Sequence, residues 1–350
     1  MSSLFIPPPA CLLRPLEVPH RYLFGPGPSN VSPRVQASGA RQMIGHLHRE
    51  MLEIMDDIKK GIQYAFQTQN SMTIAIRARV NTIVKLPGGY FTNEEIEQAL
   101  YEHKPVLFFL THGESSSGVV HPLDGIGELC HNQNCLFLVD AVASLGGSPI
   151  VMDKQGIDVL YTASQKVLSS PPGTAPISFS EGACKKIFNR KTKPVSFLLD
   201  MSWLANYWGC DGKPARMYHH TGPISGLFAL RESLAALSEM GLEKSWTQHN
   251  KIAEHLHKGL ESLGLKLFVQ EKSLRLPTIT TIAVPPGYDW REIIGYIMKH
   301  HNIEISGGLG SSSGMVLRIG LMGYNCNQAN ADMVLMALRD ALKHCHKSKV

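Results

Sequence analysis

Two apolar runs in the middle of the sequence end in charged residues of opposite sign. The run Cys135–Asp140 ends in an acid, and the run Ile157–Lys166 ends in an amine. Short runs rich in Val, Ile, Leu and Phe predict buried strands of a mostly parallel sheet. Ligands of such sheets bind outside the carboxyl ends of the strands. We therefore expect Asp140 and Lys166 to face one crevice.

A carboxylate and an amine at one crevice are what pyridoxal phosphate requires. The amine can form a Schiff base with the aldehyde, and the carboxylate can keep the pyridine nitrogen protonated, so that the ring withdraws electrons. A lysine suits this work where its surroundings lower a usual pKa of about 10.4 toward neutrality. Taken alone, Lys166 could be a solvated lysine and Asp140 a turn or cap residue.

The elements around these residues predict an α/β fold. Apolar residues recur at helical spacing from Glu50 to Phe66. A helix at Asn93–Glu102, a strand at Pro105–Thr111 and a helix near Leu123–His131 then precede the strand that ends at Asp140. Such alternation is the signature of βαβ units.

The second half predicts two long helices followed by a smaller α+β unit. The expected elements are helices at Ile224–Met240, Leu242–Leu263, Trp290–His301 and Asn327–His344, and strands at Leu265–Gln270, Thr278–Val284 and Met315–Leu321. A chain of 350 residues exceeds the usual size of a single core. We expect an N-terminal arm at residues 1–23, a large domain at 24–240 and a small domain at 241–350.

Composition excludes several classes of function. Hydrophobic residues make up 43% and charged residues 18%, as in a well-packed globular protein. The net charge of +5 is small, and the scattered basic residues form no nucleic-acid stripe. No apolar stretch approaches the about 20 residues of a membrane span. The pairs around His219 and Cys345 lack further ligands at suitable spacing, so we expect no metal site.

Several unrelated motifs occur in one order along almost the whole chain. They are Gly25–Asn30, His112–Val119, Val139–Ser144, Ser164–Lys166, Arg216–Thr221, Tyr288–Arg291 and Val316–Gly320. Together they closely resemble the alanine–glyoxylate (serine–pyruvate) aminotransferases, which are class V, fold-type I pyridoxal-phosphate enzymes. The resemblance implies a large domain with a mostly parallel sheet, a smaller C-terminal α+β domain and a homodimer.

The resemblance also implies roles for residues at the cofactor. Lys166 would hold pyridoxal phosphate as a Schiff base and then shuttle a proton. Asp140 would pair with the ring nitrogen, and Val142 would pack on one face of the ring. Ser115 and Gln165 would contact its polar edge.

Further roles concern the phosphate and the substrate. Tyr218 and Thr221 would reach the phosphate from the neighbouring subunit. Arg318 would grip the substrate carboxylate with its planar fork, beside Ser115, and Gly27 would bring backbone close to a very small substrate. Since Arg318 lies in an apolar run, a structural salt bridge is its alternative role.

The activity implied is amino-group transfer from L-alanine or L-serine to glyoxylate or pyruvate. A cysteine desulfurase, which needs a mobile cysteine near the site, and a phosphoserine aminotransferase, which needs extra basic contacts, fit less well. A catalytically impaired, dimerising isoform is the alternative from a different class.

The sequence departs from the family after Ile76. The family has a Gly-rich loop there, which binds the cofactor phosphate at a helix start, and then a helix, a strand and an aromatic residue that stacks on the ring. In this chain Ile76 runs directly into Arg77–Lys85, and no glycine or aromatic residue occurs between Gln67 and Lys85. A stretch of roughly 30 residues or more, comparable to a βαβ unit, is therefore absent. We expect a shortened sheet and weak binding of the cofactor.

The last three residues, Ser348–Val350, differ from the peroxisomal Ser-Lys-Leu signal only in the final position. We therefore expect a peroxisomal location, with a mitochondrial one as the alternative because no acidic residue precedes Glu17.

Overall fold

The computed structural model describes residues 18–42, 44, 48–75, 86–192, 194 and 196–345. Three features of the sequence lie outside these residues: most of the expected N-terminal arm, the junction from Ile76 to Lys85, and the terminal Ser348–Val350.

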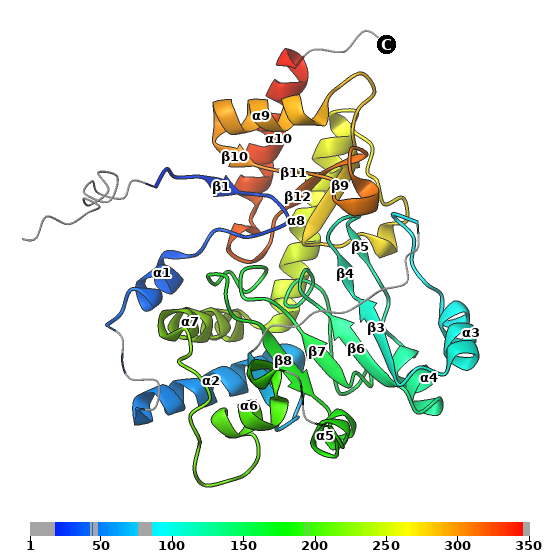
Figure 1. Ribbon diagram of the computed structural model, residues 1–350. Helices are drawn as coiled ribbons and strands as arrows, with labels where there is room; N and C mark the ends of the chain where they lie inside the picture. Colours follow the sequence, from blue (N-terminus) through cyan, green and yellow to red (C-terminus); the bar gives the residue numbers. More distant parts are fainter. Residues whose placement is uncertain are drawn as a thin grey trace, which may run out of the picture.

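A five-stranded sheet forms the centre of the larger part of the molecule (Figure 1). Its order is β2-β8-β7-β6-β3, with the bounds Thr73–Ala75 (β2), Leu107–Thr111 (β3), Leu136–Asp140 (β6), Val159–Tyr161 (β7) and Pro176–Phe179 (β8). Strands β3, β6 and β7 run parallel, whereas β8 is antiparallel to both β7 and β2. The predicted α/β fold and the strand that ends at Asp140 are confirmed.

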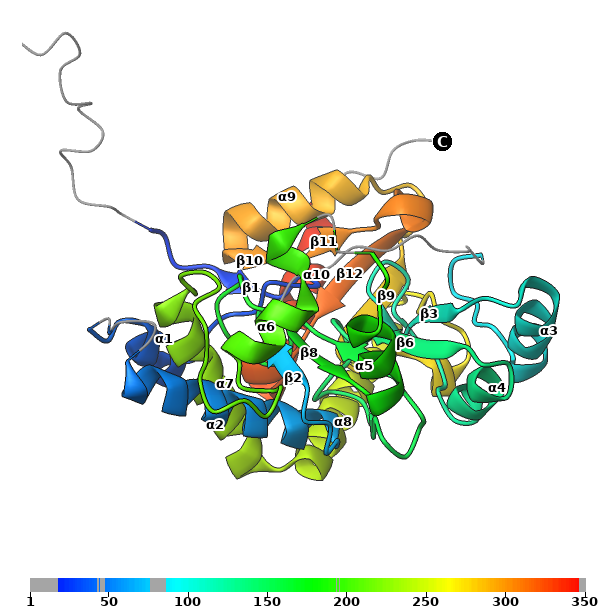
Figure 2. The ribbon, with the colours of Figure 1, turned by 60° about the horizontal axis from the view of Figure 1, so that its bottom comes forward.

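Helices cover this sheet and its two ends. They are α1 (Pro33–Gly39), α2 (Arg49–Phe66), α3 (Asn93–His103), α4 (Ile126–Asn132), α5 (Glu181–Phe188), α6 (Met201–Tyr207) and α7 (Ile224–Met240). Figure 2 shows α5 and α6 near β8 and α3 and α4 near β3. The apolar face of α2, which includes Met51, Ile58 and Phe66, is buried as its spacing predicts, and α2 packs along α7.

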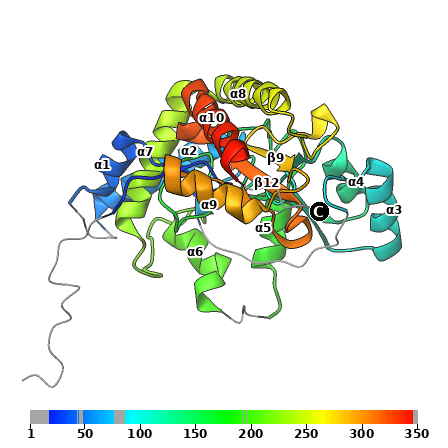
Figure 3. The ribbon, with the colours of Figure 1, turned by 90° about the horizontal axis from the view of Figure 1, so that it is seen from above.

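The C-terminal part has its own small sheet and three long helices. Its main elements are α8 (Leu242–Ser262), β9 (Ile279–Ala283), α9 (Trp290–His301), β10 (Ile303–Glu304), β11 (Ser306–Gly307), β12 (Val316–Gly320) and α10 (Gln328–His344). The sheet order is β11-β12-β9, with antiparallel pairs. Helix α10 packs against both α8 and α9, as the view from above shows (Figure 3).

Two large hydrophobic clusters correspond to these two parts. One contains buried residues from Met51 to Leu234, and the other contains buried residues from Ile252 to Ala341 together with Phe24. Phe24 follows β1 (Tyr22–Leu23), which pairs in parallel with β10. The N-terminal segment is thus tied to the C-terminal core, and the domain boundary near residue 240 stays a prediction.

One predicted strand is wrong, and several short elements, β8, α5 and α6 among them, were not predicted. The segment Leu265–Gln270 makes a single bridge, from Leu267 to Ile282, and forms no strand. The reason is that the side-chain amide of Gln270 donates to the carbonyl oxygens of Leu267 and Phe268, which bends the segment. Strand β8 and the short helices α5 and α6 follow the Pro- and Ser-rich stretch after Lys166. Within the described residues, no helix combines the length and apolar character that a membrane span needs.

Candidate active site

Lys166 lies in the loop that follows β7, five residues beyond the strand and not at its end as the sequence indicated. Backbone and side-chain hydrogen bonds fix this loop: Ser164 N–H donates to the Thr174 carbonyl at 3.1 Å, and the Ser164 hydroxyl donates to the Pro171 carbonyl at 2.7 Å. The N–H of Ser29 donates to the Gln165 carbonyl at 3.0 Å. Lys166 is therefore held at a defined place beside the N-terminal segment.

The N-terminal segment crosses directly over the Lys166 amine. Nζ donates a hydrogen bond to the Pro26 carbonyl oxygen at 2.6 Å. Gly27 has a φ of +118°, and a Cβ placed on it would lie 2.6 Å from Nζ. Only glycine allows this backbone to approach the amine so closely. Gly27 thus lies against Lys166, and its expected role beside a small substrate stays a prediction.

Asp140 ends β6 and is held by two donors. Its Oδ1 accepts from the Val142 N–H at 2.8 Å, and its carboxylate also accepts from the phenol of Tyr161. Tyr161 is the register partner of Asp140 on β7, so the parallel pairing of the two strands brings them together. Burial raises the pKa of Asp140, while Val142, Tyr161 and the positive charge of Lys166 act in the opposite direction.

Asp140 and Arg318 each lie within electrostatic range of Lys166. Burial is the largest effect on Lys166 and lowers its pKa, the guanidinium of Arg318 lowers it further, and the carboxylate of Asp140 opposes both. A lowered pKa enlarges the share of neutral amine, the form that attacks a carbonyl or takes up a proton. The expected carboxylate–amine pair is thus present.

Arg318 lies in β12 and is only 8% exposed. Its Nε donates to the Gly307 carbonyl at 2.6 Å and its Nη1 to the Ser115 carbonyl at 3.1 Å. Burial lowers the pKa of Arg318, and the charge of Glu114 opposes this. Within the described residues no carboxylate lies within salt-bridge distance of Arg318. The alternative of a structural salt bridge is therefore disfavoured, and the guanidinium remains available to an anion.

Ser115 lies at the tip of a hairpin formed by β4 (Gly113–Glu114) and β5 (Val119–Val120). The hydroxyl of Ser312 donates to the Ser116 carbonyl at 2.7 Å, and the hydroxyl of Thr281 donates to the Ser117 carbonyl at 2.7 Å. Strand β9 and the connection between β11 and β12 thus fix the hairpin tip beside Arg318.

Four other predicted residues divide into two groups. Gln165 directly precedes Lys166, and Val142 lies two residues after Asp140, in the two loops just described. Tyr218 and Thr221 are exposed, and their hydroxyl oxygens lie 3.3 Å apart. Their surface position does not by itself connect them to the site of this chain.

Sequence reasoning missed three contributors: Tyr161, Glu114 and the Pro26 carbonyl. A signal existed for Tyr161, because parallel strands that end together bring their last residues side by side. The contact of Pro26 with Lys166 joins residues 140 positions apart through a backbone atom, so residue type carries no signal for it.

The residues present fit pyridoxal phosphate. A fixed amine with a lowered pKa suits the aldehyde, an anchored carboxylate suits the ring nitrogen, and a guanidinium without a carboxylate partner among the described residues suits a substrate carboxylate. The described residues contain no group of three or more His, Cys, Asp or Glu side chains arranged to hold a metal ion.

Comparison with known proteins agrees with this geometry. The sequence model of the family described as aminotransferase class-V matches residues 72–332. An alanine–glyoxylate aminotransferase from Felis catus is 56% identical over 389 residues, with 99% of this chain and 94% of the relative covered. One from Drosophila melanogaster is 40% identical, with 97% and 96% covered.

A solved structure of an alanine–glyoxylate aminotransferase from Nostoc sp. is similar over most of both chains. The TM-score is 0.90 at 39% identity, and 94% of this chain and 97% of that chain are covered. The alignment with the cat protein spans 389 residues, more than the 350 of this chain, so that relative has residues without a counterpart here. These likenesses confirm the resemblance that the sequence motifs carry.

Proposed function

Because this chain belongs to the class V aminotransferases, we propose that it transfers the amino group of L-alanine to glyoxylate and forms pyruvate and glycine. L-Serine and pyruvate are the proposed second donor and acceptor. Alanine and glyoxylate are the substrates in the names of the similar proteins from cat, fruit fly and Nostoc. The observation that carries the proposal is the fixed Lys166 amine within electrostatic range of Asp140 and Arg318.

Lys166 is the proposed attachment and proton-transfer residue. Pyridoxal phosphate, when bound, supplies an electron-withdrawing ring that stabilises negative charge on the carbon next to the amino group. That carbon must lose a proton, and neutral Lys166 Nζ can accept it. The hydrogen bond to the Pro26 carbonyl orients Nζ, and burial together with Arg318 favours its neutral form.

Asp140 is the proposed binding residue for the cofactor ring, and Arg318 is the proposed binding residue for the substrate. The Asp140 carboxylate, fixed by Val142 and Tyr161, would pair with the ring nitrogen. Arg318 would bind the substrate carboxylate through N–H groups that the Gly307 and Ser115 carbonyls leave free. The Pro26–Gly27 backbone leaves little room above Lys166, which favours substrates with small side chains.

The surface around Tyr218 supports a homodimer. An apolar patch of exposed residues surrounds Tyr218: it consists of Phe197, Leu198, Leu199, Trp203, Met217 and Tyr218. Ring contacts join Phe197 to Trp203 and to His219, the neighbour of Tyr218, so the patch is continuous. A contiguous apolar surface of this kind marks an interaction site. We propose that a second copy covers it and receives Tyr218 and Thr221 at its cofactor phosphate.

The shortening predicted after Ile76 bears on the strength of cofactor binding. We propose that the residues missing relative to the cat protein include the Gly-rich phosphate loop. The chain would then hold pyridoxal phosphate through Lys166 and Asp140 but with less support at the phosphate. An isoform that dimerises without turnover is the alternative that this shortening favours.

A cofactor titration tests the proposal. Purified chain is incubated with increasing pyridoxal phosphate, and pyruvate formation from L-alanine and glyoxylate is measured. We expect activity that rises with added cofactor and is lost in Lys166→Ala but retained in Lys154→Ala, a change at an exposed lysine. A folded dimer without pyruvate formation at saturating cofactor would support the isoform alternative instead.

A further inference from the structure

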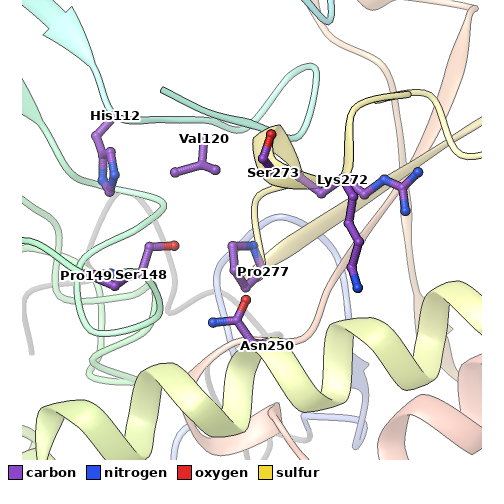
Figure 4. A pocket seen from close by; sticks show the side chains of 9 residues that line it. His112, Val120, Ser148, Pro149, Asn250, Lys272, Ser273 and Pro277 are labelled. Atoms are coloured by element: carbon purple, nitrogen blue, oxygen red, sulfur yellow. The ribbon is translucent and has the colours of Figure 1, made fainter. Parts of the chain in front are cut away.

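A cavity of about 530 Å³ lies away from the candidate active site (Figure 4). Its walls come from the base of the β4–β5 hairpin, the loop after β6, helix α8 and the segment before β9. The lining residues are His112, Val120, Ser148, Pro149, Asn250, Lys272, Ser273, Arg275 and Pro277. Neither Lys166, Asp140 nor Arg318 is among these described lining residues. The volume is within the range of about 300–1,000 Å³ that is typical of small-molecule sites.

Hydrogen bonds between backbone groups fix two of these walls together. The N–H of Leu276 donates to the Gly118 carbonyl at 2.9 Å, and Arg275 forms an isolated bridge with Val119. The Leu274 and Val269 side chains are buried beneath this contact with Val119. These two walls are therefore fixed relative to each other, although the cavity is open to solvent.

Arg275 supplies a positioned positive charge at this cavity. Its Nε donates to the Val269 carbonyl at 2.9 Å and its Nη2 to the Gln270 carbonyl at 3.0 Å. Both acceptors are neutral, and the described residues place no carboxylate within salt-bridge distance of Arg275. The guanidinium thus has further N–H donors and no carboxylate partner among the described residues, a combination that suits an anion.

Lys272, the other cation of the lining, lies at the rim. Its side chain is 73% exposed, and Nζ pairs with Glu254 at 2.8 Å. The described lining residues include no acid, so the charged residues of the lining are both positive. Glu271 and Glu254 lie near the rim but do not line the cavity.

Two buried polar side chains complete the lining. Ser148 is 3% exposed, and its hydroxyl has no hydrogen-bond partner among the described residues. In Figure 4 this hydroxyl points into the space bounded by His112, Val120 and Pro277. A buried hydroxyl without a partner is unfavourable, and a ligand oxygen or nitrogen would satisfy it. His112 is buried as well, and its Nδ1 is 2.8 Å from the Ser144 hydroxyl.

Apolar surface lies beside these polar groups. Val120, Pro149 and Pro277 form a wall that favours a hydrocarbon or aromatic body. We propose that this cavity is a second ligand site, which binds a small organic anion with an apolar body. The carboxylate or phosphate of this ligand would lie on the Arg275 guanidinium, and another polar atom would bond the Ser148 hydroxyl.

Calorimetric titration of the full chain, loaded with pyridoxal phosphate, tests this proposal. The probes are benzoate and phenyl phosphate, which distinguish a carboxylate from a phosphate, and benzyl alcohol, which has no charge. We expect saturable binding of at least one anion, at least about tenfold tighter than that of benzyl alcohol. Arg275→Gln should weaken the anion by at least about tenfold.

Matched variants separate this cavity from the substrate site. Ser148→Leu places a bulky apolar side chain in the cavity wall without changing charge and should abolish binding, and Ser148→Ala should weaken it by a few-fold. Arg318→Gln, at the proposed substrate site, and Arg291→Gln, at the exposed start of α9, should leave the anion affinity unchanged. Thermal unfolding verifies that each variant is folded. If Arg275→Gln does not fold, the Ser148 variants test the proposed ligand site.

Two results would overturn the proposal. The first is binding that persists in the Arg275 and Ser148 variants but disappears in Arg318→Gln, because the anion would then occupy only the substrate site. The second is the lack of saturable binding of either anion at concentrations up to about 10 mM. Neither result depends on turnover, so failure here leaves the proposed aminotransferase activity intact.

Discussion

At Lys166, burial and a neighbouring cation act against a neighbouring carboxylate. Burial and Arg318 lower the pKa of the amine, and Asp140 raises it, with a net decrease. Since the Pro26 carbonyl accepts from Nζ whether the amine is neutral or charged, it orients the group without fixing its charge. The residues thus supply a positioned base, a positioned acid partner for the ring and an arginine for the substrate.

The close approach of Gly27 to Lys166 predicts a strong effect of one methyl group. Gly27→Ala would place Cβ 2.6 Å from Nζ and would strain a backbone with a φ of +118°. We expect transaminase activity to fall at least about tenfold because the amine must move. Gly173→Ala is the control, since φ is +125° and nothing lies within 4 Å of its Cβ. Equal losses of activity in both variants would show that backbone strain, and not the contact with Nζ, causes the effect.

His112 predicts a pH dependence of stability. Burial, with a contribution from the positive charge of His121, lowers the pKa of His112 from 6.5 to about 3. The unfolded chain therefore binds more protons between these values, so the stability that His112 contributes is present above pH 6.5 and is lost as pH falls toward 3. Between pH 7 and pH 5 we expect the natural chain to lose about 2 kcal/mol more than His112→Gln.

Urea unfolding at both pH values measures this difference. The matched control is His103→Gln, at an exposed histidine in the last turn of α3, which should behave as the natural chain. A His112→Gln variant with the same pH slope as the natural chain would contradict a neutral, buried His112.

At the scale of elements, the site depends on how β6 and β7 are aligned. Their parallel register sets Asp140 beside Tyr161, and the loops that follow carry Val142 and Lys166. Asp158, just before β7, secures this alignment: its Oδ2 accepts from the Phe137 N–H of β6 at 2.9 Å. It also accepts from His131 at the end of α4 and from Ser180, the N-cap of α5.

Removal of the Asp158 carboxylate should loosen several elements at once. Asp158→Ala leaves the buried Phe137 N–H without its partner and frees Ser180 and His131, so we expect a loss of about 3 kcal/mol in the free energy of unfolding. Asp57→Ala breaks an exposed ion pair with Arg231 and should cost less than about 1 kcal/mol. Chemical denaturation measures the free energy of unfolding of both variants. Equal losses would exclude the proposed role of Asp158.

For the molecule as a whole, the sequence predictions agree with the structure in two cases: where an apolar pattern extends over several turns, and where the chemistry of a residue indicates its role. The helices at Ile224–Met240 and Trp290–His301 have the predicted bounds, because their apolar spacing extends over several turns. The short β8, α5 and α6 carry too few residues for such a signal. The pairing of β1 with β10 joins distant parts of the chain through backbone atoms, which residue types do not reveal. In the site, Asp140 and Lys166 were predictable from residue type and position, whereas Pro26 was not.

The apolar patch predicts the oligomeric state. Leu198→Glu places a charge in this patch and should convert a dimer into monomers in sedimentation experiments, because an unpaired charge in an apolar interface is costly. Cofactor affinity should fall at the same time, since Tyr218 and Thr221 would no longer reach a second subunit. Met336→Glu, at an exposed position of α10, is the control and should stay dimeric. A Leu198→Glu dimer with unchanged affinity would refute this arrangement.

The most direct measurement identifies the side chain that carries the cofactor. The chain is incubated with pyridoxal phosphate and reduced with borohydride, which fixes the cofactor to its lysine, and peptides are then mapped by mass spectrometry. Our account predicts one stoichiometric label at Lys166, lost in Lys166→Ala and kept in Lys154→Ala. A label at another lysine, or a label spread over exposed lysines with none at Lys166, would contradict it.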